Sequence, residues 1–484
     1  MKSIGVIDTT LRDAHQCLWA TRMTTPMILP IAETIDRAGF AQVDLMGAIQ
    51  YDVCVRYLNE DPWERVRLVR KRMTRTPLRA LVRSRNLISF DMLPDDVVEL
   101  FIERMAANGF GVIGAFDGLN DVDNMLVGIR AAKRAGARTF GALAYSHSPV
   151  HTDELYVRTA KDLVERAGVD FIMLKDSAGL LTPERMHSLV PSIKAVIGDI
   201  PLELHSHCLT GLANQVYLDG VELGADLVHL SVAPLADGSA QPAMQTIVPQ
   251  LRERGFGVDV DDACIAAISA HFAEIARTHN KPVGVPIAYD PFHYEHQVPG
   301  GMKTNFEFQL REAGMSEKLD EVLHECARIR EELGWPIMIT PFSQFVGTQA
   351  VLNVVRGERY AIVPDEVKKY ALGYYGKLVA PVDPDVLDRI VRNGSSRIPL
   401  EPKRPEPAVA ALRRKYPDAD DDERVLRAMF MGTQVDAMIA GGGRTLEHRP
   451  LASPLEVLRE AVTENRDIAF FSLASPNANL VINR

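Results

Sequence analysis

The chain has 484 residues, of which 46% are hydrophobic, and a formal net charge of −10. This length can bury two domains, or one barrel with an appendage, and the acidic balance argues against nucleic acid as a partner, since binding to phosphates needs a concentrated basic face. No apolar run reaches the roughly 18 residues of a membrane span, and the N-terminus lacks a signal-peptide layout. We therefore expect a cytoplasmic protein.

Eight short apolar runs are predicted to be strands, and the segments between them show helical spacing, as in "VVELFIERMAANG" (97–109). Eight such units predict a TIM (β/α)8 barrel. A doubly wound open sheet is the structural rival, but it usually carries a glycine-rich phosphate turn after its first strand, and none occurs here. The predicted strands are residues 3–8, 40–46, 77–82, 110–116, 139–145, 169–175, 200–206 and 226–231.

Beyond about residue 250 the sequence becomes mainly helical. A long irregular connection (283–305) precedes predicted helices at 316–334, 341–357 and 364–376, a breaker-rich link at 397–409 and a helix ending near Met431. A bridge at 439–444, a helix at 454–463 and a strand at 469–474 are predicted for the tail. We therefore expect three parts: a barrel domain (1–285), a helical domain that completes the active site (286–432), and a tail (433–484) that contacts a partner.

The five cysteines are widely scattered and show no CxxC spacing, which favours buried thiols over disulfides or a thiolate zinc site. They are Cys17, Cys54, Cys208, Cys264 and Cys326.

The working residues of a TIM barrel lie at the C-terminal ends of its strands, and polar residues gather at four of these positions. Strand 7 ends in His205 and His207, which share one face because side chains alternate along a strand. With a carboxylate from another strand end, such as Asp13, they can hold a divalent metal ion. The alternative is that both histidines are solvated and bind no metal ion. The full set at these strand ends is Arg12, Asp13, His15, Gln16, Arg83, Lys175, Asp176, His205 and His207.

Lys175 ends an apolar strand, "FIMLK", and has two readings. It could form a salt bridge with Asp176 or Asp226. It could also be partly desolvated beside a cation and react with CO2 to give a carbamate, an anionic oxygen ligand that would complete a four-ligand sphere.

Arg12 and Arg83 carry forked guanidinium groups suited to a small carboxylate or an enolate oxygen. Surface solvation is the alternative for each. Together with a Lewis-acid metal, the two arginines predict a site that binds a 2-oxo acid and stabilises its enolate.

Six separated motifs resemble the carboxyltransferase component of biotin-dependent enzymes, a group that includes pyruvate carboxylase, the oxaloacetate decarboxylase alpha subunit and the methylmalonyl-CoA carboxytransferase 5S subunit. The resemblance covers roughly residues 3–432, and the motifs fall in the family's order. They are "DTTLRDAHQCLWATR" (8–22), "EDPWERVRLVR" (60–70), "SPVHT" (148–152), "LKDSAGLLTPE" (174–184), "HSHCLTG" (205–211) and "VPGGMKTN" (298–305).

The resemblance implies a role for each matching residue. A zinc, cobalt or manganese ion is held by Asp13, carbamylated Lys175, His205 and His207. The 2-oxo acid is bound by Arg12, Gln16 and Arg83. Thr304 moves a proton between the biotin nitrogen and the pyruvate methyl group. Asp8 and His15 are expected only to brace their loop.

The chain departs from the family on the biotin side. The motif "DLMGAIQYD" (44–52) has Met46 in place of a tryptophan and Ala48 in place of a glycine. A family tyrosine that lines the biotin pocket together with the aspartate matching Asp52 is Phe90 here, which removes a hydrogen bond worth about 0.5–1.5 kcal/mol. The biotin contact or the acceptor acid can therefore differ.

No segment resembles a Met-Lys-Met biotin attachment site. We expect one subunit of a homodimer or higher oligomer, served by a separate biotinyl carrier protein together with a biotin carboxylase or an acyl-CoA carboxyltransferase subunit. Two alternatives remain. One is a metal-dependent aldolase, lyase or Claisen-type condensing enzyme of the same barrel superfamily, which needs neither the Lys175 carbamate nor the "PGGMKTN" loop. The other is a scaffold with a vestigial site.

Overall fold

The computed structural model describes residues 2–299, 302, 306, 310–312, 314–441, 470–475 and 478–483. Eight parallel strands form a closed barrel in sequence order, and β1 pairs with β8 to close it. All eight predicted strands are therefore confirmed, and barrel closure excludes the open-sheet rival. The strands are β1 (Gly5–Asp8), β2 (Gln42–Gly47), β3 (Leu78–Arg83), β4 (Val112–Phe116), β5 (Arg138–Ala144), β6 (Phe171–Asp176), β7 (Leu202–Ser206) and β8 (Leu227–Leu230).

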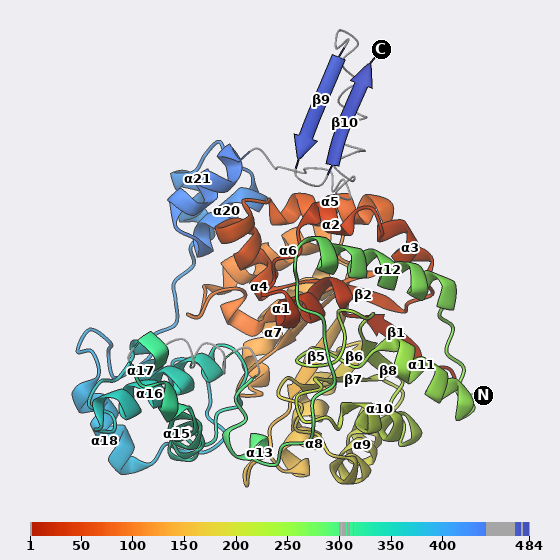
Figure 1. Ribbon diagram of the computed structural model, residues 1–484. Coiled ribbons are helices and arrows are strands. Elements are labelled where there is room, and N and C mark those ends of the chain that lie inside the picture. The colour runs from red at the N-terminus through yellow and green to blue at the C-terminus, as the bar shows by residue number, and fades with distance from the viewer. Residues whose placement is uncertain are drawn as a thin grey trace.

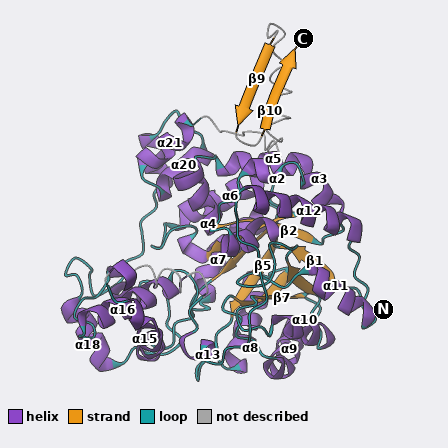
Figure 2. Ribbon diagram, in the orientation of Figure 1, coloured by secondary structure: helices purple, strands orange, loops and turns teal. Residues whose placement is uncertain are grey.

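Helices surround the barrel (Figures 1 and 2). Several begin at a side-chain cap, as where Asp61 accepts the backbone N–H of Trp63 beside a proline in the first helical turn. The helices are α1 (His15–Leu18), α2 (Thr25–Ile28), α3 (Ala32–Arg37), α4 (Ala48–Val53), α5 (Pro62–Arg72), α6 (Asp95–Asn108), α7 (Val122–Arg134), α8 (Asp153–Asp162), α9 (Pro183–Ile197), α10 (Ala213–Glu222), α11 (Met244–Glu253) and α12 (Asp262–Thr278).

The C-terminal part is helical, and the helices predicted at 316–334, 341–357 and 364–376, and the one ending near Met431, are confirmed. It also contains α18 and α21, which the periodicity analysis missed. Within the described residues no helix is long and apolar enough to cross a membrane. The helices are α13 (His293–His296), α15 (Leu319–Glu332), α16 (Phe342–Arg356), α17 (Asp365–Ala371), α18 (Pro384–Asn393), α19 (Val409–Lys415), α20 (Asp421–Met429) and α21 (Gly432–Ala440).

Two apolar cores divide the chain differently from the predicted boundaries. The residues of the second core, apart from Leu119, run from Val298 to Ile390. Val425 and Met438, on α20 and α21, belong instead to the main core between strands and helices. The end of the predicted helical domain and the start of the predicted tail thus pack on the barrel, as their place beside α6 in Figure 1 also indicates.

The predictions for the tail fare unequally. The strand predicted at 469–474 is found as β9 (Phe470–Ser475), which pairs antiparallel with β10 (Ala478–Asn483). Ile439 and Ala440, the start of the predicted bridge, are the last residues of α21. The rest of that bridge beyond Gly441 and the predicted helix at 454–463 lie outside the described residues.

The helical domain is placed at the C-terminal end of the barrel strands. Ile337 and Ile339, just before α16, join the apolar cluster of the barrel interior together with Phe116 at the end of β4. The Arg330 guanidinium of α15 donates to Gln297 Oε1 (2.9 Å) and to Ser146 Oγ in the loop after β5 (3.3 Å). The domain therefore lies over the end of the barrel where TIM-barrel active sites are built.

Candidate metal centre and substrate pocket

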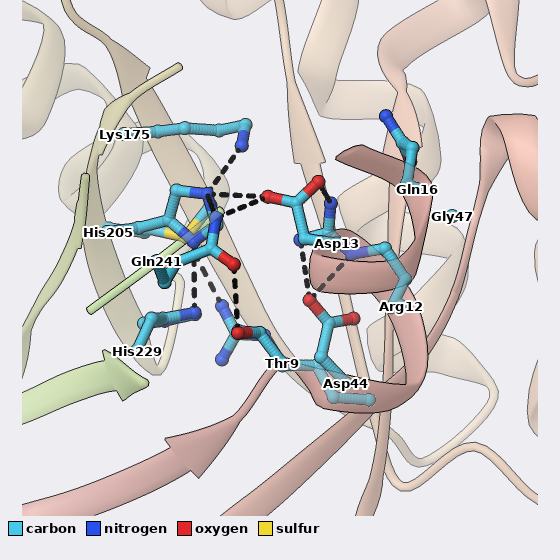
Figure 3. A network of polar contacts seen from close by, with 12 residues as sticks. Thr9, Arg12, Asp13, Gln16, Asp44, Gly47, Lys175, His205, His229 and Gln241 are labelled. Carbon is cyan, nitrogen blue, oxygen red and sulfur yellow. Dashed lines mark hydrogen bonds and ion pairs between the residues drawn. The ribbon is translucent and has the colours of Figure 1, made fainter. Parts of the chain in front are cut away.

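Three side chains from two strand ends meet at one buried point (Figure 3). Asp13 comes from a π-helical turn after β1, His205 from β7 and His207 from the residue after β7. Asp13 Oδ2 lies 2.9 Å from His205 Nε2 and 3.2 Å from His207 Nε2. One ligand atom from each of the three residues falls within 4.8 Å of the others, and all three residues are buried. One carboxylate and two imidazoles are a donor set that suits zinc, cobalt or manganese.

Lys175 lies beside this group, with Nζ 3.0 Å from His205 Nε2. The salt-bridge reading is not supported, because Asp226 pairs with Lys2 and Lys194, while Asp176 accepts bonds from the backbone after β6 and from Ser206. Burial lowers the pKa of Lys175 to about 8, against the opposing charge of Asp13. This environment raises the fraction of the neutral amine, which is the form that reacts with CO2, above that of an ordinary lysine.

Electrostatics keep Asp13 ionised and His205 neutral. Burial alone would raise the pKa of Asp13, but Arg12, His207 and Lys175 hold it well below its ordinary value. Burial and the neighbouring Lys175 lower the pKa of His205 well below its ordinary value. An anionic carboxylate and a neutral imidazole are the forms that bind a metal ion. Against the effect of burial, Cys17 and Asp13 raise the pKa of His207 to about 10, so His207 would release a proton when it binds a metal ion.

Gln241 is a member of the site that the sequence analysis missed. It lies in the loop between β8 and α11, and its Nε2 donates to Asp13 Oδ2 (2.9 Å) and lies 3.1 Å from His207 Nε2. Its Oε1 accepts from Thr9 Oγ1 (3.0 Å). The rule that polar residues follow barrel strands could have found Gln241 had it been applied to the eighth strand, as it was to the first, third, sixth and seventh.

Arg12 was predicted to bind substrate, and its guanidinium group is held by two neighbouring carboxylates. Its Nε and Nη2 both donate to Asp44 Oδ2 (2.8 and 2.6 Å), and Nη1 lies 2.6 Å from Asp13 Oδ1. Arg12 is 4% exposed. Gln16 lies nearby, half-buried, and its Oε1 accepts from Gln50 Nε2 (3.3 Å). In these contacts, Arg12 links the candidate metal ligand Asp13 to β2.

Arg83 lines a pocket between the barrel and the helical domain, apart from the candidate metal centre. Its Nη2 donates to the backbone oxygen of Ile88 (2.6 Å), its guanidinium lies 5.5 Å from the ring centroid of Phe90, and burial lowers its pKa to about 10. Asp52 forms an ion pair with Arg56 (3.4 Å), and burial raises the pKa of Asp52. The pocket is lined by Arg83, Asn86, Phe116, Asp117, Gly118, Thr340, Pro341, Phe342 and Tyr375.

The remaining predicted residues divide into three groups. Asp8 accepts from Thr10 Oγ1 (2.5 Å) and His15 is fully buried, and the bracing roles of both stay a prediction. Met46 is fully buried in the main apolar core, away from the polar centre. Thr304, the predicted proton carrier, lies outside the described residues.

Comparisons with known proteins show which families and proteins this chain is similar to. Residues 294–439 match the family model described as a conserved carboxylase domain, and residues 121–271 match the HMGL-like family. The chain is 44% identical over 401 residues to a pyruvate carboxylase subunit of Methanocaldococcus jannaschii, covering 82% of this chain and 70% of that protein. It is 37% identical over 400 residues to the methylmalonyl-CoA carboxyltransferase 5S subunit of Propionibacterium freudenreichii subsp. shermanii, covering 82% and 78%.

A solved structure is similar over most of its length. It is the carboxyl transferase domain of Rhizobium etli pyruvate carboxylase with oxamate and biotin, at a TM-score of 0.83 and 28% identity, covering 91% of this chain and 78% of that chain.

Proposed function

This chain belongs to the carboxyltransferase family of biotin-dependent enzymes, and we propose that it moves a carboxyl group between carboxybiotin and a 2-oxo acid of the pyruvate and oxaloacetate class. The observation that carries the proposal is the buried group of Asp13, His205 and His207 with Lys175 Nζ 3.0 Å from His205. A metal-dependent aldolase needs the first three residues but not the lysine.

Asp13, His205 and His207 would hold a zinc, cobalt or manganese ion, with carbamylated Lys175 as the fourth ligand. When bound, the cation supplies Lewis-acid stabilisation of the negative charge on the enolate oxygen. Lys175 reaches its carbamylated form when the neutral amine attacks CO2 and releases one proton, which leaves a single negative charge on the new carboxylate. The buried position of Lys175 supports this step, because it disfavours the ammonium form.

The resemblance to the family, not the geometry, assigns the substrate residues. Arg12, Gln16 and Arg83 would orient the 2-oxo acid, and Asp52 and Phe90 would flank the biotin ring at the Arg83 pocket. Thr304 would take a proton from the C3 methyl group of pyruvate and deliver one to the biotin nitrogen as its bond to the carboxyl carbon breaks. The enolate carbon then attacks the released CO2, so protons and carboxyl groups balance.

We further propose that biotin arrives on a separate carrier protein and that a biotin carboxylase or an acyl-CoA carboxyltransferase subunit completes the complex. Both relatives described above carry the word subunit in their names, which supports a multi-subunit assembly. The direct test is to purify the chain with its native partners, identify any biotinylated subunit and measure discharge of carboxybiotin by pyruvate, 2-oxobutyrate and 2-oxoglutarate. Discharge by at least one acid is expected. Metal-dependent cleavage of a 2-oxo acid without any biotinylated partner would overturn the proposal in favour of the aldolase or lyase class.

Two variants separate the proposed metal and proton roles. Lys175→Ala is expected to abolish carboxyl transfer and to lower bound metal, because it removes the carbamate ligand. Thr304→Ala is the matched control, since it should retain metal and still stop transfer. Metal content by atomic emission and transfer rates check both, and full activity of Lys175→Ala would eliminate the carbamate.

A further inference from the structure

A line of buried polar side chains runs from the candidate metal centre into the barrel interior. His205 and Glu203 share the inward face of β7, His229 lies on β8 and Arg79 on β3. Each of these four residues is 0 or 1% exposed. TIM-barrel interiors are filled mainly by branched apolar side chains, so a charged pair and two imidazoles at this depth need a reason.

The contacts along this line are continuous. His205 Nε2 faces Asp13 at the metal centre, and His205 Nδ1 lies 3.2 Å from His229 Nδ1. The rings of the two histidines are nearly perpendicular, and Figure 3 shows His229 beneath His205 on the side away from Asp13. His229 Nε2 then lies 3.3 Å from Glu203 Oε2.

Arg79 fixes the chemical form of Glu203 at the far end of the line. Its Nη1 and Nη2 donate to the two carboxylate oxygens (2.8 and 2.5 Å), and its guanidinium is itself held by Gln42 Oε1 (2.7 Å). A carboxylate bound in this two-pronged way is ionised and can only accept hydrogen bonds. The bond to His229 must therefore be donated by the imidazole.

The direction of the His229–Glu203 hydrogen bond also fixes which nitrogen of His205 carries the proton at the candidate metal centre. A neutral imidazole carries one N–H, so His229 with its proton on Nε2 has only a lone pair on Nδ1. His205 must then donate from Nδ1, which leaves the lone pair of Nε2 for a metal ion held between it and Asp13 Oδ2, 2.9 Å away. A metal-binding histidine is commonly oriented through its other ring nitrogen in this manner.

We propose that Arg79, Glu203 and His229 form a relay of positioning residues that fixes the tautomer of His205 and thereby prepares Nε2 as a metal ligand. The inference rests on the metal centre proposed above. It assigns a function to three residues outside the motif resemblance, and it places the control of a metal ligand on the opposite side of the barrel, at β3.

The first test compares two substitutions of nearly equal size at position 229. His229→Asn keeps an acceptor, Oδ1, at the place of Nδ1, whereas His229→Leu removes it. We expect His229→Leu to weaken binding of Zn²⁺ and Co²⁺ by about 10–100-fold in competition with a chelator, and to change the visible absorption spectrum of bound Co²⁺. His229→Asn should restore most of both. Equal metal affinity in wild type and His229→Leu would overturn the relay.

The variant Phe171→Leu controls for a general loss of barrel stability. It alters the apolar cluster of the barrel interior and none of the relay residues. This variant should lose stability but keep its affinity for Co²⁺; a loss of affinity as large as that of His229→Leu would assign the effect to general loosening. Failure of the wild-type chain to bind any divalent metal is a different result, because it would overturn the proposed function itself.

Glu203→Gln provides a second readout that requires no metal. An amide beside Arg79 can present either its oxygen or its nitrogen to His229 Nε2, so the variant removes the ionised acceptor that fixes the His229 proton. In metal-free protein labelled with 15N-histidine, the His205 proton is expected on Nδ1 in wild type, and Glu203→Gln is expected to populate the form with the proton on Nε2. An unchanged tautomer of His205 in the folded variant would contradict the relay.

Discussion

At the scale of single residues, Arg12 is held between two buried carboxylates, Asp13 and Asp44, whose side chains are 3% and 1% exposed. Removing one partner of a buried ion pair leaves charge without compensation and typically costs about 3–5 kcal/mol. Asp44→Ala is therefore expected to lower the free energy of unfolding by about 3 kcal/mol, at the low end of that range, because Asp13 still pairs with Arg12. Urea unfolding measures this change.

The matched control is Asp262→Ala, which removes a carboxylate 2.9 Å from Arg252 at the surface, where the Asp262 side chain is 76% exposed. Surface pairs contribute up to about 1 kcal/mol, so this variant should lose much less stability. Similar losses in both variants would mean that the Arg12 pair is not desolvated in solution.

Residues at strand ends could be predicted from alternation along one strand, and those facing them from other strands could not. The spacing of His205 and His207 placed both on one face, and the same rule extends to Glu203. Asp44 opens the motif at 44–52, but nothing in that motif pairs it with Arg12, and His229 belongs to no motif found in the sequence. Their contacts to Arg12 and His205 depend on barrel closure and on the register of β2 and β8, which a single sequence does not specify.

At the scale of elements, Asp36 joins α3 to the turn that leads into β3. Its carboxylate accepts from the backbone N–H groups of Thr74 (2.9 Å), Arg75 (3.1 Å) and Thr76 (2.7 Å). Burial opposes ionisation, but these bonds lower the pKa of Asp36 below its ordinary value of 3.8. The stabilisation is thus fully present above pH 3.8 and is lost as the pH falls through the lower pKa of the folded state.

Asp36→Asn is expected to reduce the free energy of unfolding by about 2 kcal/mol at pH 7, because bonds to a charged acceptor contribute about 1.5–3 kcal/mol. The difference from wild type should shrink at pH 3, below the ordinary pKa of 3.8, because wild type has begun to lose the same contribution. Unfolding curves at both pH values provide the measurement, with exposed Asp199→Asn as control. A difference that is constant with pH would disprove the charge-based account.

Element prediction succeeded where periodicity was strong and failed where a short amphipathic helix followed a proline-rich turn. The barrel strands are buried on both faces and therefore read as continuous apolar runs. In α18, Asp383 caps the helix by accepting from the backbone of Asp385 and Val386, and Pro384 occupies the first turn. This start signal was present in the sequence, but the helix buries only Val386 and Ile390, so its apolar stripe is thin.

At the scale of the whole molecule, the barrel and the helical domain share a pocket that neither forms alone. Arg83 and Gly118 contribute from the barrel, and Phe342 and Tyr375 from the helical part. Sequence patterns assigned these segments to separate domains and could not place them against each other, because contacts between domains follow shape rather than periodicity. The shared pocket is where we place the predicted completion of the active site, which stays a prediction.

Gly118→Ala tests this shared pocket. A Cβ atom at Gly118 would lie 2.5 Å from the Phe342 ring, and Phe342 also packs against Phe345, Tyr370 and Tyr375. Such overpacking typically costs about 1–3 kcal/mol. Because Phe342 and Arg83 line one pocket, the ring displacement should also raise the KM for carboxybiotin several-fold, with a smaller change in the KM for the 2-oxo acid.

Gly111→Ala is the matched control, since its Cβ would make an ordinary contact of 3.6 Å with Pro77. It should leave both stability and KM near wild type. Of the two added methyl groups, only the one at position 118 would clash with the helical domain. If Gly118→Ala lowered stability while both KM values stayed unchanged, Phe342 would be a packing residue alone, and the biotin side of the site would have to be sought away from Arg83.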